Sequence, residues 1–524
     1  MAVFVPEPSP AAAAAMPAIP SIPAVRSFTP TAGGTWRPAS GTRVVAPVGS
    51  AVEDEARLLA AELNVPYANG PPGPGDISLS LQWVNDNPEA YELASSASGI
   101  AIRGTTDAGV FYGTRTLLQV LRARGGFPGG IVQDRPDRPQ RGLMVDVGRK
   151  YFTPGWLRAR IGELSYLKLN ELHLHLSDNQ GFRVQSTTHP EVVSARHLSK
   201  ADIRDLVAYA ARRHLTVIPE IDSPGHLGAV LAAHPSLQLR TRLGVPVNGA
   251  IDISNPRSAT LLDDLIKEYA PLFPGRYWHL GGDEYGALTV PDPQAAFPQL
   301  AAYARSRFGP AGTVADAATA WLNDRSAVLR RYGRTTKVWN DGFFSSPRSW
   351  PDAGREVEYW SSNVQRGPLP ETYLREGRTL VNLNSWYLYY VLGSPASFPY
   401  PSGRAIYERW TPAVVYRDRA VPAALAGADR ILGGRLAVWC DHGDAQTETQ
   451  IAAGIRLPLR ALAQKVWDPR TPALSWEGFK SLANAVGQEA ARIGGVGEGA
   501  GRGASLARRR REATRWGYPL LERS

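Results

Sequence analysis

Residues 142–179 read GLMVDVGRKYFTPGWLRARIGELSYLKLNELHLHLSDN, and this stretch decides the fold. It begins and ends with short apolar runs, over residues 142–147 and 170–176, which have the length of buried strands. Residues 154–168 lie between them and form one amphipathic segment of helical length. A strand, a helix and a second strand in this order are typical of a parallel βαβ unit.

The same alternation recurs along the chain. Amphipathic segments such as 200–214 and 315–333 separate six further apolar runs. We expect strands at LTVIPEI (215–221), RYWHLG (276–281), TKVW (336–339), EVEYW (356–360), TLVNLN (379–384) and RLAVW (435–439). Eight repeats predict an α/β fold with a (β/α)8 TIM barrel, which we assign to residues 140–492.

A small α+β domain is predicted before the barrel, over residues 41–135. Short alternating segments predict its strands, and two amphipathic segments, 51–63 and 105–123, predict its helices. We interpret GGFPGG (125–130) as a break in the chain. The strands are expected at TRVVAPV (42–48), GDISLSLQWV (75–84), AYELASS (90–96) and GIAIRG (99–104).

The first 40 residues are rich in alanine and proline, and we expect them to be a disordered leader. They lack the basic start and compact apolar core of a secretory signal peptide. Either an export signal is missing from this chain or the protein is not exported by that route. Localisation is left open, and a secreted bacterial protein is one expectation.

The net charge is +10, and part of this excess lies in a Gly/Arg-rich tail over residues 493–524. We interpret the tail as a solvated basic segment rather than a nucleic-acid-binding arm, so nucleic acid is not an expected partner. No stretch approaches the roughly 18 apolar residues that a membrane span needs, so no membrane association is expected either. The single cysteine, Cys440, excludes an intramolecular disulfide.

Polar and aromatic residues gather at the carboxyl ends of the expected strands. Strand ends are often polar because loops begin there, but exposed aromatic residues beside acids indicate a binding site. The mouth of a TIM barrel is also where such proteins place their chemistry. Acids beside aromatic rings are typical of a sugar site. The residues are Asp146, Arg149, Asp178, Asp222, His226, Asp283, Glu284, Trp339, Asp341, Trp360, Asn384, Tyr387, Trp439 and Asp441.

His173 and His175 raise the alternative of a metal site, because His-x-His on a strand is a metal-ligand pattern. Residues two apart on a strand face the same way. In metal-dependent barrels of this kind the pair lies on the first strand, whereas here it closes the second. We therefore favour inward, hydrogen-bonded residues that fill the barrel, and expect no metal.

Four segments resemble, in order, the motifs of family twenty glycoside hydrolases, the β-N-acetylhexosaminidases. They are DVGRKYF (146–152), HLHLSDNQGFR (173–183), PEIDSPGH (219–226) and HLGGDEY (279–285). The resemblance covers the barrel through Trp439, and residues 99–121 resemble the family's non-catalytic domain. It implies a retaining exo-glycosidase that removes terminal β-linked N-acetylglucosamine or N-acetylgalactosamine from a glycan or chitooligosaccharide.

The resemblance also implies how the adjacent acids Asp283 and Glu284 would share the work. In this family the acetamido oxygen of the substrate is the nucleophile, and an oxazolinium intermediate forms. Glu284 would then be the general acid/base, while Asp283 would hold the acetamido group. Asp178, Asp222 and His226 would support Glu284. No metal or organic cofactor is implied.

The implied substrate-binding residues surround these acids. Arg149 would bind the hydroxyls on carbons 3 and 4, and Tyr387 would donate to the acetamido oxygen. Asp441 would lie on the far side of the sugar. The tryptophans that wall the acetamido pocket would be Trp339, Trp360 and Trp439.

Two segments depart from the family pattern. A common Tyr-x-Asp is replaced by Tyr387-Leu388-Tyr389, and a common Trp-x-Glu by Trp439-Cys440-Asp441. A lacto-N-biosidase, which releases Gal-β1,3-GlcNAc by the same mechanism, therefore remains an alternative. A catalytically dead sugar-binding barrel is an alternative of another class, and the intact acid pair argues against it. The oligomeric state is left open.

Overall fold

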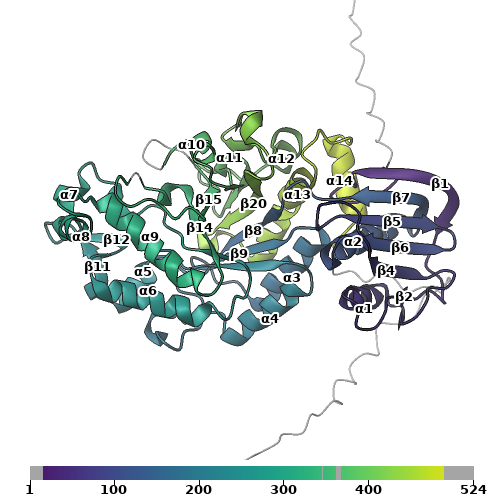
Figure 1. Ribbon diagram of the computed structural model, residues 1–524, viewed down its shortest axis with the longest axis horizontal. Coiled ribbons are helices and arrows are strands. Elements are labelled where there is room, and N and C mark those ends of the chain that lie inside the picture. Colours follow the sequence, from purple (N-terminus) through teal and green to yellow (C-terminus); the bar gives the residue numbers. More distant parts are fainter. Residues whose placement is uncertain (1–15, 345, 362–366, 489–524) are drawn as a thin grey trace, which may run out of the picture.

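The computed structural model describes residues 16–344, 346–361 and 367–488, and these form a small sheet domain beside a larger barrel (Figure 1). The tail assigned to residues 493–524 lies outside the described residues. Within the described part of the chain, no helix combines the length and the apolar character that a membrane span requires.

The barrel is closed by eight parallel strands, which confirms the predicted (β/α)8 fold. Neighbouring strands pair in chain order, and β16 pairs with β20 to complete the ring. All eight expected strands are present. They are β8 (Gln140–Asp146), β9 (Glu171–His175), β10 (Thr216–Glu220), β13 (Tyr277–His279), β14 (Thr335–Trp339), β15 (Glu356–Tyr359), β16 (Leu380–Asn382) and β20 (Ile431–Trp439).

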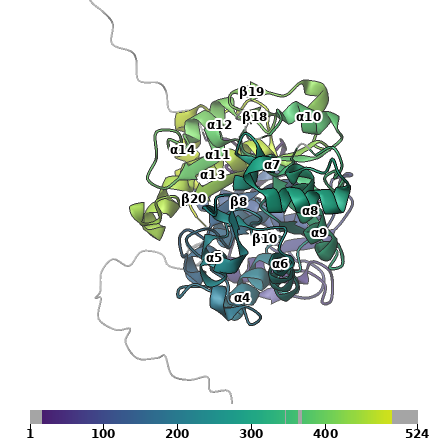
Figure 2. The ribbon, with the colours of Figure 1, turned by 90° about the vertical axis from the view of Figure 1, so that its left-hand side faces the viewer.

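Helices surround the strands, as Figure 2 shows in a view turned by 90° from that of Figure 1. Side-chain caps fix where several of them begin: Ser199 and Thr313 form capping boxes, and Thr153 accepts from the backbone of Trp156. The helices of the ring are α3 (Pro154–Tyr166), α4 (Lys200–Ala211), α6 (Pro256–Tyr269), α9 (Val314–Arg330), α10 (Pro370–Arg375), α12 (Gly403–Arg409) and α13 (Glu448–Trp467), and α14 (Trp476–Ala485) follows them.

Shorter elements occupy the loops at the mouth of the barrel. β17 (Tyr389–Val391) pairs with the end of β20, so it extends the sheet above the ring. The remaining elements are α5 (Gly228–Ala233), β11 (Gln238–Arg240), β12 (Pro246–Ile251), α7 (Pro293–Ala296), α8 (Pro298–Phe308), α11 (Ser385–Leu388), β18 (Val414–Tyr416) and β19 (Arg419–Ala420).

The small domain is a seven-stranded mixed sheet with two helices. Helix α2 (Asp107–Arg124) lies against the barrel. The hydrophobic core of the small domain includes Tyr166 and Trp467, which belong to helices of the barrel. In sheet order the strands are β1 (Ser27–Trp36), β7 (Phe127–Asp134), β5 (Tyr91–Ser96), β6 (Gly99–Gly104), β4 (Ile77–Leu81), β2 (Val44–Val45) and β3 (Tyr67–Ala68), and the first helix is α1 (Glu53–Leu63).

Two expectations for this domain were wrong. The described part of the leader is not disordered, because β1 pairs antiparallel with β7 and Ile22 is fully buried. The expectation that all of GGFPGG is a break was also wrong: Gly125 and Gly126 do separate α2 from the next strand, but residues 127–130 begin β7. Its glycines permit a close approach, since a Cβ on Gly129 would lie 2.3 Å from the carbonyl oxygen of Gly34. Both strands depend on long-range pairing, which local composition does not reveal.

The interior of the barrel is charged at its lower end. Arg435 forms ion pairs with Glu171 and Glu358, and Lys337 forms one with Glu356. These side chains are almost fully buried. Because a buried charge is costly unless it is paired, each of these groups depends on its partners.

Candidate active site

A pocket opens at the carboxyl ends of the barrel strands. It combines charged groups with aromatic and aliphatic walls, and its residues come from loops that are far apart in sequence. The sequence predicted seven of its ten lining residues. The lining residues are Arg149, His226, Asp283, Glu284, Trp360, Tyr389, Val391, Phe398, Trp439 and Asp441.

The turn after β13 separates the two adjacent acids. Gly281 and Gly282 have φ angles of 71° and 93°, and a Cβ on Gly281 would lie 1.7 Å from Oδ1 of Asp222. The amide of Gly282 donates to that same oxygen at 2.8 Å. Glu284 itself has a φ of 48°, which is uncommon for a residue with a side chain. Asp283 is consequently buried, whereas the Glu284 side chain is 36% exposed.

Asp222 is a buried neighbour of Asp283, and its surroundings favour the protonated form. Burial, together with the charge of Asp283, raises the pKa of Asp222 well above its ordinary value. A proton on Asp222 would also let this carboxyl donate to Asp283. Asp341, on the other side, has a pKa raised to about 7, first by burial and then by Asp283. Asp283 therefore lies between two acids, Asp222 and Asp341, whose pKa values are raised.

His226 links the acid pair to the barrel. Its Nε2 lies 3.5 Å from Oε2 of Glu284 and 3.6 Å from Oδ2 of Asp283, and its Nδ1 lies 3.3 Å from Oδ1 of Asp178. Burial alone lowers the pKa of this imidazole, but the charge of Asp283 and the bond to Asp178 outweigh it. The pKa of His226 is therefore well above its ordinary value.

Asp178 and Arg149 form the next layer. Asp178 accepts from Nε2 of His175 at 2.9 Å and pairs with Arg149 at 2.9 Å. Although burial opposes ionisation, the bonds from His175 and His226 hold the pKa of Asp178 well below its usual range. Arg149 also pairs with Asp146 at 3.0 Å, so two carboxylates fix its orientation. Its guanidinium lies 5.2 Å from the centre of the Trp439 ring.

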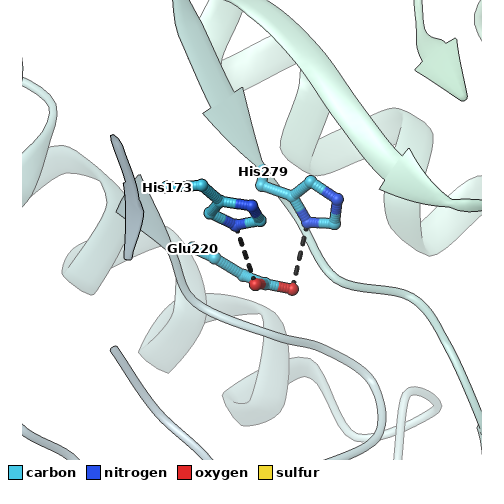
Figure 3. A group of neighbouring side chains, drawn as sticks. All are labelled: His173, Glu220 and His279. Carbon is cyan, nitrogen blue, oxygen red and sulfur yellow. Dashed lines mark ion pairs between the residues drawn. The ribbon is translucent and has the colours of Figure 1, made fainter. Parts of the chain in front are cut away.

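The histidines of the His-x-His segment point into the barrel, as expected. Nε2 of His173 lies 2.9 Å from Glu220, and Nδ1 of His279 lies 3.0 Å from the same carboxylate (Figure 3). Nδ1 of His175 lies 2.8 Å from Glu220 as well. All four side chains are buried, and burial lowers the pKa of His173 to about 4. These contacts with Glu220 give the histidines a role in filling the barrel below the pocket.

Two of the three predicted tryptophans line the pocket. Trp360 stacks on Tyr389 with ring centres 6.0 Å apart, and its indole N–H donates to Asp341 at 3.0 Å. Trp439 lies 5.9 Å from Tyr389. Trp339 does not line the pocket: it is fully buried below it and donates to Oε1 of Glu220 at 2.8 Å. It therefore supports the floor of the pocket.

The prediction that Tyr387 lines the pocket was wrong. Tyr387 belongs to the short helix α11 and packs in the main hydrophobic core. Tyr389, two residues later on β17, lines the pocket instead, and Val391 follows it on the same face. The side chain of Asn384 caps the N-terminus of α11, and β17 begins only after this helical turn, at Tyr389. Nothing in the local sequence distinguishes Tyr387 from Tyr389. The pocket residues that the sequence analysis did not predict are Tyr389, Val391 and Phe398.

A second hollow begins on the other side of Glu284, which lines both. Five of its seventeen lining residues are aromatic. Among them Trp350 is exposed, whereas Phe343 and Tyr373 are buried. Arg378, which pairs with Glu376, supplies charge. We call this hollow the Trp350 groove. Its position makes Glu284 the boundary between a deep pocket and an open groove.

Comparisons with known proteins identify both domains. The model described as "Glycosyl hydrolase family 20, catalytic domain" matches residues 139–470, and "Glycosyl hydrolase family 20, domain 2" matches residues 18–135.

Individual relatives agree with these matches. A lacto-N-biosidase of Bifidobacterium bifidum is 27% identical over 464 residues, which cover 87% of this chain and 40% of the relative. A β-N-acetylhexosaminidase of Cellulomonas fimi is 31% identical over 60% of this chain and 61% of the relative. The chain thus spans less than two thirds of either relative. The structure of a β-N-acetylhexosaminidase from Streptomyces coelicolor A3(2) matches with a TM-score of 0.72 and 26% identity, covering 90% of this chain and 95% of that one.

Proposed function

The chain belongs to glycosyl hydrolase family 20, and we propose that it hydrolyses terminal β-linked N-acetylhexosamine residues of glycans or chitooligosaccharides. The observation that carries the proposal is the splayed acid pair. Asp283 points into a buried acidic environment, Glu284 stands at the edge of the pocket, and His226 contacts both. Two acids with such different surroundings suit two different tasks on one sugar.

We propose that the substrate's own acetamido oxygen attacks the anomeric carbon. As that bond forms, the bond to the leaving-group oxygen breaks and Glu284 gives this oxygen a proton. Asp283 accepts the acetamido N–H and stabilises the positive charge of the oxazolinium ring. Water then opens the ring while Glu284 takes back a proton, so the β configuration is retained. An internal nucleophile of this kind is worth roughly 7–11 kcal/mol.

Tyr389 takes the task for which the sequence suggested Tyr387. Burial raises the pKa of Tyr389 well above its ordinary value, so its hydroxyl keeps its proton. We propose that it donates to the acetamido oxygen and orients it toward the anomeric carbon. Trp360 and Trp439 would then enclose the acetamido methyl group, and Arg149 would bind sugar hydroxyls with its fixed guanidinium.

Glu284→Gln and a pair of substrates test this proposal. 4-Nitrophenyl N-acetyl-β-glucosaminide should be hydrolysed by the protein, and turnover should fall by roughly 10²–10⁴-fold in Glu284→Gln. 4-Nitrophenyl β-glucoside, which lacks the acetamido arm, should be a very poor substrate. Equal rates on the two substrates would exclude the internal nucleophile, and unchanged turnover by Glu284→Gln would leave only a sugar-binding barrel.

Release of the disaccharide Gal-β1,3-GlcNAc is the second candidate. The far side of the pocket favours it, because Val391 is apolar there and Asp441 is exposed at the rim. The lacto-N-biosidase relative, similar over most of this chain, supports the same reading. Hydrolysis of 4-nitrophenyl β-lacto-N-bioside, compared with the monosaccharide substrate, decides between the two. Activity on the disaccharide substrate alone would make this the function.

We place the leaving group in the Trp350 groove. Glu284 must face the glycosidic oxygen, so the part of the glycan beyond this oxygen lies on the side of Glu284 away from the pocket. The aromatic walls of the groove suit the apolar faces of sugar rings. Substrates with several sugars beyond the cleaved bond should therefore be favoured over short ones.

A further inference from the structure

We propose that the side chains of His189, Glu191 and His234 form a binding site for a divalent transition metal ion, for which Zn²⁺ is the best fit. This rim site is separate from the catalytic pocket and does not depend on the proposed reaction. Its donor atoms lie within 4.8 Å of one another. Two imidazoles and one carboxylate are a donor set that Zn²⁺ prefers.

The spacing of the donors matches a small tetrahedral site. Oε1 of Glu191 lies 3.0 Å from Nδ1 of His189 and 2.9 Å from Nε2 of His234. Zinc bonds of about 2.0–2.2 Å place tetrahedral ligand atoms about 3.3 Å apart. The two distances to Glu191 would therefore have to lengthen by only a few tenths of an ångström to admit an ion, and the two histidine nitrogens lie within 4.8 Å of each other. All three side chains are partly exposed, with 19–42% of their surface accessible, so an ion and a water ligand can reach them.

A fourth residue supports the orientation of one ligand. Oδ2 of Asp264, on α6, lies 3.7 Å from Nε2 of His189. Metal-bound imidazoles usually turn their second nitrogen toward a carboxylate, which fixes the tautomer and leaves the other nitrogen free to bind the ion. This distance is longer than a hydrogen bond, so Asp264 would have to move closer by a few tenths of an ångström to hold His189 in the form in which Nδ1 is the ligand.

Other clusters in the described part of the chain fit a metal less well. His173, Glu220 and His279 are fully buried, and Glu220 already pairs with His175 and Trp339. The cluster of Glu55, Asp107 and His214 contains a single imidazole. Of these three clusters, only the rim site has two imidazoles and is also accessible to solvent.

An ion at the rim site would join two loops that carry proposed active-site residues. His189 precedes the short helical turn η1 (Pro190–Val192) in the loop after β9, which also carries Asp178. His234 ends α5 in the loop after β10, which also carries His226. η1 packs against α5. The ion would hold the two loops together from the outside, while Asp178 and His226 meet inside.

Titration of the full chain with ZnCl₂ tests the inference. The protein should carry no histidine tag and should first be treated with a chelator. Isothermal titration calorimetry should find one tight site, and Zn²⁺ should raise the melting temperature. His234→Ala should remove the site, and Asp264→Asn should weaken it by about 10–100-fold. The matched control His214→Ala should bind as the unchanged protein does.

Co²⁺ gives a readout that does not depend on stability. In the unchanged protein it should show the visible absorption of a tetrahedral ion, and this should vanish in His234→Ala. Glu191→Gln, an isosteric change at an exposed position, replaces His234→Ala if that variant fails to fold. Zinc binding that is absent, or equal in the unchanged protein and these variants, would overturn the inference.

Discussion

Replacing Asp222 with asparagine should leave the protein active and make it relatively more stable as the pH rises. Asp222 is fully buried and its pKa is raised well above the ordinary value, first by burial and then by Asp283. We therefore predict that Asp222 stays neutral in the folded protein up to neutral pH. Asparagine is also neutral: its oxygen can accept from Gly282 as the carboxyl does, and its amide can donate to Asp283.

The magnitude follows from the protons bound in each state. Unfolded Asp222 loses its proton near pH 3.9, whereas the folded residue keeps it. The stabilising contribution is complete below pH 3.9 and is lost as pH rises toward the folded pKa, by about 1.36 kcal/mol per pH unit. Asparagine does not titrate. From pH 5 to pH 7 the variant should therefore gain up to about 2.7 kcal/mol relative to the unchanged protein.

Urea unfolding of both proteins at pH 5, 6 and 7 measures this difference, and the rate on a nitrophenyl substrate checks the site. Asp222→Ala is the control, because it strands the amide of Gly282 and removes the partner of Asp283. Each loss costs about 1–3 kcal/mol of folding free energy, so Asp222→Ala should be less stable than Asp222→Asn at every pH. Identical pH slopes for Asp222→Asn and the unchanged protein would refute a neutral Asp222, as would an inactive Asp222→Asn.

Three other substitutions test separate parts of the site. Tyr389→Phe should lower kcat by about 10–100-fold, the loss expected for a hydrogen bond to a charged group, while Tyr387→Phe should leave kcat nearly unchanged. Equal effects of the two substitutions in steady-state assays would contradict the placement of these tyrosines. Gly281→Ala should destabilise the fold by more than the ~1–2 kcal/mol of a left-handed alanine, because its Cβ also meets a buried carboxyl; an unchanged melting temperature would refute this. Trp350→Ala should lower kcat/KM on chitooligosaccharides by about 5–10-fold, a loss of about 1 kcal/mol, but should not change it on nitrophenyl substrates. The control Trp83→Ala, which changes another exposed tryptophan, should leave kcat/KM unchanged on both kinds of substrate.

The barrel was predictable because each of its strands carries its own signal. Runs such as GLMVDV are apolar and bounded by turns, so the local sequence suffices. The sequences of β1 and β7 show no such apolar run, because proline and glycine interrupt them. They form strands through their pairing with each other. The same reasoning explains the leader, whose Ile22 is buried through contacts with residues far along the chain.

The chemistry of the pocket was more predictable than its walls. Asp283, Glu284 and His226 lie four to six residues beyond the ends of β13 and β10, so their place at the mouth of the barrel followed once the strands were known. Tyr389 could not be distinguished from Tyr387, because α11 delays the strand by one helical turn and no local pattern predicts such a turn. Phe398 reaches the pocket from a loop, and its neighbour there is Tyr389.

The charged interior of the barrel bears on how this protein can evolve. Arg435 serves two carboxylates at once, so a single exchange there would strand two buried acids. Neutral drift should therefore be slow below the pocket and require paired changes. Trp350 is 76% exposed and belongs to no buried ion pair, so a change at this position alone can alter what the groove binds while the acids of the pocket stay in place.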